Sequence, residues 1–183
     1  SVFPGTGYPS PGVPVFDGLI QPHGGYSNTT GIAVDDFNED GVEDLAFSHV
    51  AYGVSTLIGD EQSGAGTGTF GSLRSIYNGS NSSWIETADV NGDFHSDLIV
   101  TNRNDNRLSV FPGNGDGTFG SRSDKTVSSP RRFVVGDFLK DGAKDVVVLN
   151  DTQALFLAGT KTGGIPDGKF DDPVSYSVGS GAK

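Results

Sequence analysis

The sequence contains no cysteine and no methionine. Without cysteine, the fold has no disulfide bonds and no thiolate that could bind a metal or attack a substrate. The 183 residues also include no apolar run of about 18 residues, so no segment is expected to span a membrane as a helix. The chain begins at Ser1 without a methionine or a signal peptide, which we interpret as a piece of a longer precursor.

Positive charge is scarce as well. Twelve Lys and Arg residues stand against 23 Asp and Glu residues, which gives a formal net charge of −11. Binding to a phosphate backbone requires clustered Lys and Arg, so we expect no nucleic-acid partner. An acidic chain does suit cation binding, because a bound cation relieves part of the repulsion between carboxylates.

The most informative feature present is a nine-residue acidic motif that occurs three times. We call the copies loop one (residues 36–44, DFNEDGVED), loop two (89–97, DVNGDFHSD) and loop three (137–145, DFLKDGAKD). They recur about every 50 residues, an interval typical of repeat architectures. Two further markers keep the same order in each unit. A strand closes on Gly5, Gly59, Gly113 and Gly159, and a glycine-rich turn precedes Phe70, Phe119 and Phe170.

Each unit has the pattern of four short strands. The first (GIAV, WIETA, RFVVG) precedes the acidic loop and the second (DLAFSHV, DLIVTN, DVVVLN) follows it. Both are nearly continuous apolar runs, which predicts burial on both faces. The third strand ends on the glycine, and the fourth follows the phenylalanine turn, as in PVSYSV from Pro173. No segment shows convincing helical periodicity.

Units of about 40 to 50 residues with four strands each are typical of a β-propeller. We therefore predict an all-β fold, a β-propeller of four-stranded antiparallel blades, as a single segment over residues 1–183. The expected parts are a half-blade at 1–31 and blades at 32–84, 85–132 and 133–183, or about three and a half blades. An open end of this kind exposes strand edges and apolar surface, which favours self-association if the chain is complete.

The spacing of oxygen-bearing side chains in the acidic loops predicts calcium binding, because such a loop can wrap a hard cation. Backbone carbonyls would add a ligand from the seventh place of each loop. An EF-hand is disfavoured, because Phe47 stands where its twelfth-place Glu would be. The candidate ligands are Asp36, Asn38, Asp40, Val42 and Asp44 in loop one, Asp89, Asn91, Asp93, His95 and Asp97 in loop two, and Asp137, Asp141, Ala143 and Asp145 in loop three.

The three loops differ in completeness. Loop one has every ligand and a turn glycine, Gly41, whereas loop two has Phe94 at that glycine's place. In loop three, Leu139 replaces the third-place ligand, and Lys140 and Lys144 add positive charge. For loop three we favour the alternative, a structural Asx-type turn that holds no metal.

These residues resemble the FG-GAP/VCBS repeat family, found in integrin α-subunit propellers and many bacterial surface proteins. The resemblance rests on DFNEDGVEDL, DVNGDFHSDLIV, GDFLKDGAKDVVVL and VFPGNGDGTFG. It implies roughly seven or eight blades in the complete ring, closed within one chain or completed by partners. It also implies calcium between the first two strands of a blade. Family members are mostly extracellular adhesion or carbohydrate-binding modules, and some are fused to enzymes.

We therefore expect a non-catalytic, calcium-binding module for adhesion or assembly, secreted or at the cell surface. Its partners would be other protein chains or missing blades of the same precursor, and possible ligands include glycans. One alternative is a lectin, in which Trp84, Tyr26, Tyr52 or Tyr77 stacks on a sugar and Arg103 or Arg107 binds it. For Trp84 and the arginines, a packing role and a solvated turn are the favoured interpretations. A polysaccharide lyase or hydrolase is the other alternative, although the sequence has no G-x-S-x-G nucleophile motif.

Overall fold

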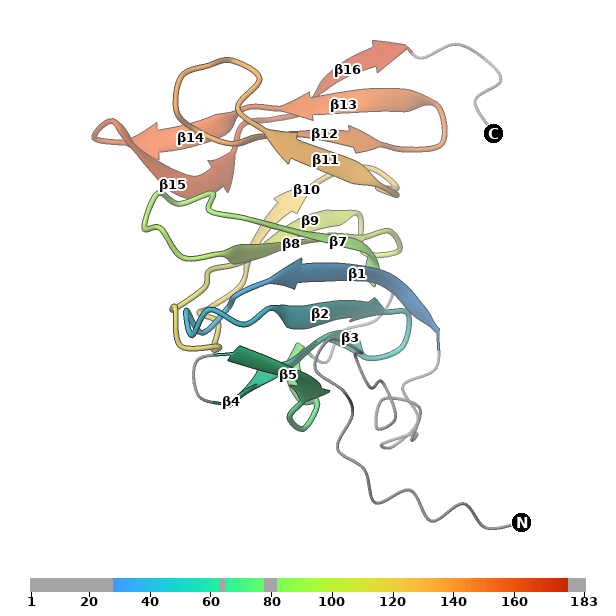
Figure 1. Cartoon of the computed structure of the whole chain (residues 1–183). Helices are drawn as coiled ribbons and strands as arrows, with labels where there is room; N and C mark the ends of the chain where they lie inside the picture. The colour runs from blue at the N-terminus through green and yellow to red at the C-terminus, as the bar shows by residue number, and fades with distance from the viewer. Residues whose placement is uncertain (1–27, 63–64, 78–81, 178–183) are drawn as a thin grey trace.

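The computed structural model describes residues 28–62, 65–77 and 82–177. Within these ranges all regular structure is β, in three four-stranded antiparallel sheets that are stacked face to face like propeller blades (Figure 1). The predicted all-β propeller architecture is confirmed. The half-blade expected at residues 1–31 lies almost entirely outside the described ranges. In the part of the chain that the structure describes, no helix is long and apolar enough to cross a membrane.

Each sheet is a meander in which every strand pairs with its neighbour in the chain, except where a hairpin is inserted before the fourth strand. Sheet one contains β1 (Thr29–Asp35), β2 (Asp44–His49), β3 (Gly53–Leu57) and β6 (Arg74–Tyr77). Sheet two contains β7 (Ser82–Ala88), β8 (Asp97–Asn102), β9 (Arg107–Phe111) and β10 (Ser123–Thr126). Sheet three contains β11 (Phe133–Gly136), β12 (Asp145–Leu149), β13 (Gln153–Leu157) and β16 (Val174–Ser177).

The glycine-rich segments before the repeated phenylalanines form more structure than the sequence predicts. In the first unit they form a hairpin of β4 (Gly59–Gln62) and β5 (Ala65–Phe70), and in the third unit a hairpin of β14 (Gly159–Thr162) and β15 (Ile165–Phe170). In the second unit the same segment is a tighter turn, closed by a single bridge between Gly113 and Phe119. These hairpins and this turn lie beside the acidic loops.

Two of the expected blade boundaries fall inside strands. The boundary at 31/32 lies within β1 and the boundary at 84/85 lies within β7, whereas β11 begins at Phe133 as expected. Thr29, Thr30, Ser82 and Ser83 start these two strands. Their small polar side chains carry no apolar signal, which is why the sequence does not reveal where the strands begin.

The core lies between the sheets. One cluster joins sheets one and two through residues such as Ala46, Ile85 and Leu98. A second cluster joins sheets two and three through Ile99 and Val146, among others. Every residue of β8, the second strand of the middle sheet, is buried, as its apolar run predicts.

The prediction that first strands are buried on both faces is wrong for the two outer sheets. Ile32 and Val34 of β1 are 55% and 50% exposed, and Val134 of β11 is 54% exposed. Ala33 and Phe133, which point the other way, are buried. The reason is that side chains alternate along a strand, and among the described residues only one face of each outer sheet packs on another sheet.

Candidate metal-binding loops

The three acidic loops connect the first and second strands of their sheets and share one backbone conformation. In each loop the fourth and sixth residues have positive φ, namely Glu39 and Gly41, Gly92 and Phe94, and Lys140 and Gly142. Phe94 therefore takes up the left-handed conformation that glycine takes up in the other two loops, with a φ of 72°. This shared geometry extends to loop three, although its sequence has diverged most.

The candidate ligands at the first, third and fifth places hold the loop by accepting backbone N–H groups. In loop one, Asp36 accepts hydrogen bonds from the N–H groups of Asp40 at 3.1 Å and Gly41 at 2.7 Å. Asp40 accepts the N–H of Val42 at 2.8 Å, and the Asn38 amide donates to the Asp40 carboxylate at 2.7 Å. Loop two has the same bonds with Asp89, Asn91 and Asp93, except that the fourth residue, Gly92, and not the fifth donates to the first Asp.

The ninth-place aspartates have a different position, because Asp44, Asp97 and Asp145 are fully buried. Each accepts an N–H from the second residue of its loop and another from the strand-end glycine, which stands two residues after the third strand. For Asp97 these donors are Val90 and Gly113, both at 2.9 Å. The same pair is Phe37 and Gly59 for Asp44, and Phe138 and Gly159 for Asp145. The ninth Asp thus joins the acidic loop to the third strand.

This junction explains the repeated strand-end glycine. A Cβ on Gly113 would lie 2.3 Å from the carbonyl oxygen of Ser96, and one on Gly159 would lie 2.3 Å from that of Lys144. On Gly59 the distance to the Glu43 carbonyl oxygen would be 2.7 Å. These separations are too short for a carbon atom, so only glycine allows the two backbones to approach.

Negative charge accumulates in loops one and two. Burial is the main cause that raises the pKa of Asp97 to about 6, and the charges of Asp93 and Asp89 contribute to the rise, against the lowering effect of the two N–H donors. Burial likewise raises the pKa of Asp44, with Asp40 and Asp36 adding to the effect. The carboxylates of each loop are therefore close enough to repel one another.

Each of these loops also receives a hydrogen bond from the following unit. The N–H of Gly117 donates to the carbonyl oxygen of Phe37 at 2.8 Å, and the N–H of Gly168 donates to that of Val90 at 3.1 Å. Both glycines stand two residues before a repeated phenylalanine and have positive φ. The glycine-rich turn of one unit thus closes the acidic loop of the unit before it.

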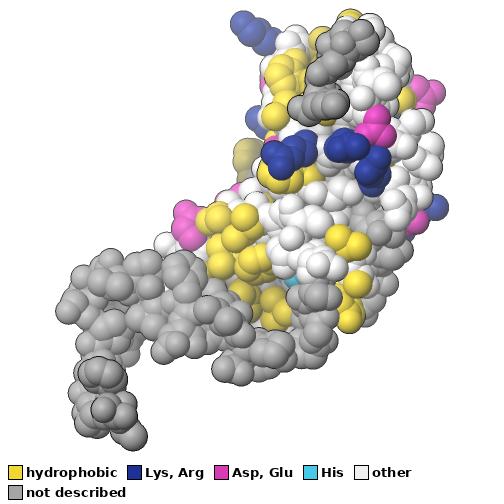
Figure 2. Space-filling model, turned by 90° about the vertical axis from the view of Figure 1, so that its right-hand side faces the viewer, with side chains coloured by type: hydrophobic (Ala, Val, Ile, Leu, Met, Phe, Trp, Pro, Cys, Tyr) yellow, Lys and Arg dark blue, Asp and Glu magenta, His cyan; other side chains and the backbone are white. Residues whose placement is uncertain are grey.

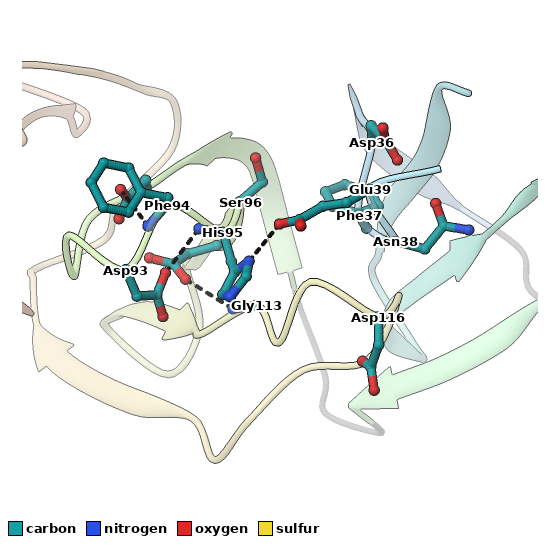
Figure 3. A network of polar contacts seen from close by, with 12 residues as sticks. Asp36, Phe37, Asn38, Glu39, Asp93, Phe94, His95, Ser96, Gly113 and Asp116 are labelled. Carbon is teal, nitrogen blue, oxygen red and sulfur yellow. Dashed lines mark hydrogen bonds and ion pairs between the residues drawn. The ribbon is translucent and has the colours of Figure 1, made fainter. Parts of the chain in front are cut away.

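Loops one and two touch through an imidazole and a carboxylate. Nδ1 of His95 lies 2.5 Å from Oε1 of Glu39, which bridges two blades (Figure 3). The hydrogen bond to Glu39 raises the pKa of His95 above its ordinary value. The sequence analysis considered only the backbone carbonyl of His95, because nothing local to either loop indicates that the two loops are neighbours.

A lysine from the neighbouring hairpin contacts loop three. Nζ of Lys161, on β14, lies 3.2 Å from Oδ2 of Asp141 and also donates to the backbone carbonyl of Asp141. The Ala143 N–H and then Lys161 lower the pKa of Asp141. Sequence reasoning named Lys140 and Lys144 as the positive charges and missed Lys161. Aligning the units on their strand-end glycines would have placed Lys161 beside the loop.

The donor atoms of loops one and two fit a hard cation such as calcium. Each loop offers three carboxylates, one amide oxygen and a backbone carbonyl, which are the ligand types calcium prefers. Across the described ranges, no group of three or more His, Cys, Asp or Glu residues is arranged so that it could hold a metal ion. The carboxylate oxygens instead accept N–H groups, and each has lone-pair capacity for a further partner. Loop three, with Leu139 and Lys161, does not fit.

Three of the residues considered for sugar binding, Trp84, Arg103 and Arg107, have partners within the chain. Trp84 packs against the core between sheets two and three, with the guanidinium of Arg132 4.6 Å from its ring centre. Arg103 pairs with Asp151 at 3.0 Å and Arg107 with Asp124 at 2.7 Å. In the view of Figure 2, some Lys and Arg side chains lie near the middle of the surface and others lie at its edges, with Asp and Glu side chains among them. Tyr26 lies outside the described residues.

The comparisons with known proteins agree with this architecture. Residues 89–148, from loop two to β12, match a family model described as an FG-GAP-like repeat. No curated protein matches the chain. A solved structure of an Agrocybe aegerita lectin, studied for its recognition of non-reducing terminal N-acetylglucosamine, is similar, with a TM-score of 0.53 and 22% identity.

The alignment covers 80% of this chain and 37% of the lectin chain, so the chain spans well under half of that relative. At this identity the likeness concerns the fold, and it supports the propeller arrangement of the three sheets. Together, the repeat and the fold support a propeller-type binding module. The match of residues 89–148 to the FG-GAP-like repeat model agrees with the resemblance on which the acidic loops were interpreted.

Proposed function

We propose that this chain is a non-catalytic, calcium-stabilised propeller module, secreted or at the cell surface, that serves adhesion or assembly with other protein chains. The observation that carries the proposal is the pair of loops one and two. Each carries three candidate carboxylate ligands within nine residues between two strands, and burial together with repulsion from the neighbouring carboxylates raises the pKa values of Asp44 and Asp97. A divalent cation at either loop would relieve that repulsion.

Calcium would act on the fold through the strands that the loops connect. In loop one, Asp36, Asn38, Asp40 and the carbonyl of Val42 would hold the ion together with Asp44. Asp44 already accepts the N–H of Gly59 at the start of β4, and the loop accepts the N–H of Gly117 from the next unit. Neutralising the loop would therefore stabilise its own sheet and its contact with the next one.

The outer face of sheet three supports the assembly role. Val134, Val147, Phe156 and Val174 are paired in register across all four strands and form one apolar row. Val134 and Val174 are 54% and 52% exposed, and Tyr176 beside them is 57% exposed. A sheet face of this composition is suited to packing against a further blade or another chain.

The calcium proposal is tested by differential scanning calorimetry of the chain in EDTA and in calcium. We expect calcium to raise the melting temperature by several degrees, roughly the shift of a 1 to 2 kcal/mol stabilisation in a domain of this size. The pair Asp40→Asn and Asp93→Asn should remove most of this shift. Asp105→Asn, in an exposed turn, is the control and should keep it. An identical melting temperature in EDTA and calcium would overturn the proposal.

The assembly proposal is tested by sedimentation velocity over a range of protein concentrations. We expect the unmodified chain to associate, and Val134→Lys with Tyr176→Lys to weaken that association, because lysines would place charge on the apolar row. Asp105→Lys, in the exposed turn between β8 and β9 of the middle sheet, is the control and should leave association unchanged. A monomer at all concentrations in calcium would contradict self-association.

A further inference from the structure

The three units place different side chains at one equivalent position beside the acidic loop. This position is two residues after the strand-end glycine, and it holds Glu61, Gly115 and Lys161 in the three units. Glu61 pairs with Gly66 in the first hairpin, and Lys161 pairs with Pro166 in the third, so the two hairpins have the same register here. The charge at one structural position therefore runs from negative through neutral to positive.

Lys161 directs its charge at loop three. Its ammonium donates to the backbone carbonyl of Asp141 and lies 3.2 Å from that residue's carboxylate. The Lys161 side chain is 25% exposed, so the contact is partly shielded from water. Asp141 is the fifth-place residue, whose equivalents Asp40 and Asp93 are candidate calcium ligands in loops one and two.

The other two units have no cation at this position. Glu61 adds another carboxylate on the hairpin beside loop one. Gly115 has no side chain, and the space where its Cβ would stand is filled by His95, whose Nδ1 would be 2.5 Å away. Loop three also lacks an oxygen at its third place, where Leu139 is 55% exposed.

We propose that Lys161 is a built-in counter-ion that neutralises loop three in place of a divalent cation. The residue two places after the strand-end glycine then determines which acidic loops of this chain take a metal. The part that concerns loops one and two rests on the proposed calcium function. A tethered ammonium is present at any calcium concentration, so loop three keeps its shape when calcium is scarce, whereas loops one and two respond to it.

The counter-ion role is tested first without metal. In EDTA, Lys161→Met should lower the melting temperature by a few degrees, because Asp141 loses its partner, while Lys161→Arg should keep most of the stability. Lys169→Met, on the same hairpin, is the control and should leave the melting temperature unchanged. Equal melting temperatures for Lys161→Met and the unmodified chain would overturn the counter-ion role.

The selectivity role is tested by calcium titration calorimetry. The unmodified chain should bind about two calcium ions, and the double variant Leu139→Asn with Lys161→Glu about three, because loop three then has the oxygen donors of loop one. Glu61→Lys should bind about one ion fewer than the unmodified chain. No added ion in the double variant would overturn this role. An unmodified chain that binds no calcium overturns the proposed function instead, and the experiment in EDTA still decides the role of Lys161.

Discussion

The buried carboxylate of Asp97 accepts a hydrogen bond of 2.9 Å from the backbone N–H of Gly113, which follows the third strand of its sheet. The same carboxylate accepts the N–H of Val90 at the start of loop two. One side chain thus fixes the loop to two separate pieces of backbone, independently of any metal.

Replacing Asp97 with alanine should cost about 2 to 5 kcal/mol in the free energy of unfolding, because two buried N–H groups would lose their acceptor. Asp97→Asn keeps one acceptor oxygen and should cost less. Urea denaturation in EDTA measures both effects without calcium. The expectation fails if Asp97→Ala is no more destabilising than Asp105→Ala in an exposed turn.

Gly113→Ala should destabilise the chain by about 1 to 3 kcal/mol, because the added Cβ must push the backbone away. Its position would be 2.3 Å from the Ser96 carbonyl oxygen. Gly120→Ala is a matched control, since the nearest atom to its Cβ would be 3.6 Å away, at an ordinary contact distance. Chemical denaturation of the two variants side by side gives the comparison, and equal stabilities would contradict the close approach.

Phe94→Gly should raise the free energy of unfolding by about 0.5 to 1 kcal/mol, because glycine tolerates left-handed backbone that other residues adopt at a cost. The Phe94 side chain is 91% exposed, so little packing is lost. Thermal unfolding measures the gain. Phe138→Gly provides the contrast, because Phe138 packs on Phe156 and should lose stability on truncation. A lower melting temperature for Phe94→Gly would show that the strain is absent.

Thr56→Val should stabilise the chain by about 1 kcal/mol, because it removes a buried hydroxyl that has no hydrogen-bond partner. Among the described residues, Oγ1 of Thr56 is the buried side-chain polar atom that lacks a hydrogen-bond partner. Thr101→Val is the control, since its hydroxyl donates to the Arg131 carbonyl at 2.7 Å and its removal should destabilise. Similar effects of the two substitutions on urea denaturation would contradict this prediction.

The stability of the chain should depend on pH through His49. Burial lowers the pKa of His49 below its ordinary value of 6.5, so between these two pKa values the unfolded chain binds more protons. Neutral His49 therefore contributes fully to the free energy of unfolding when the pH is above the pKa of His49 in the unfolded chain. This contribution decreases as the pH falls below that pKa. The melting-temperature difference between the unmodified chain and His49→Gln should shrink from about pH 7.5 to about pH 5. A difference that stays constant across this range would contradict the assignment.

The sequence predicts the parts of the fold that depend on local pattern. Apolar runs on either side of loops 36–44, 89–97 and 137–145 identify the first two strands, and the strand-end glycines mark the third. The predicted burial on both faces holds for β8 of the middle sheet, whereas β7 is only partly buried and Ile32 and Val134 are exposed, because burial depends on which sheets are adjacent. The calcium ligands remain predictions.

Contacts between distant segments are less accessible from the sequence. The contact of Glu39 with His95 joins residues 56 positions apart and requires the packing of two blades. The contact of Lys161 with Asp141 requires the register of a hairpin whose glycine-rich sequence shows no alternating apolar pattern. Both contacts depend on tertiary structure, which the residues next to either partner in the sequence do not indicate.

The bonds from Gly117 to Phe37 and from Gly168 to Val90 run in one direction along the chain, from each unit to the unit before it. Each acidic loop therefore depends on a turn that belongs to the next sheet. Separating two sheets would remove from the first one the turn that closes its loop. Removing the third unit would destabilise loop two directly and leave the closing bond of loop one intact. Local unfolding would therefore pass from the C-terminal unit toward the N-terminal one.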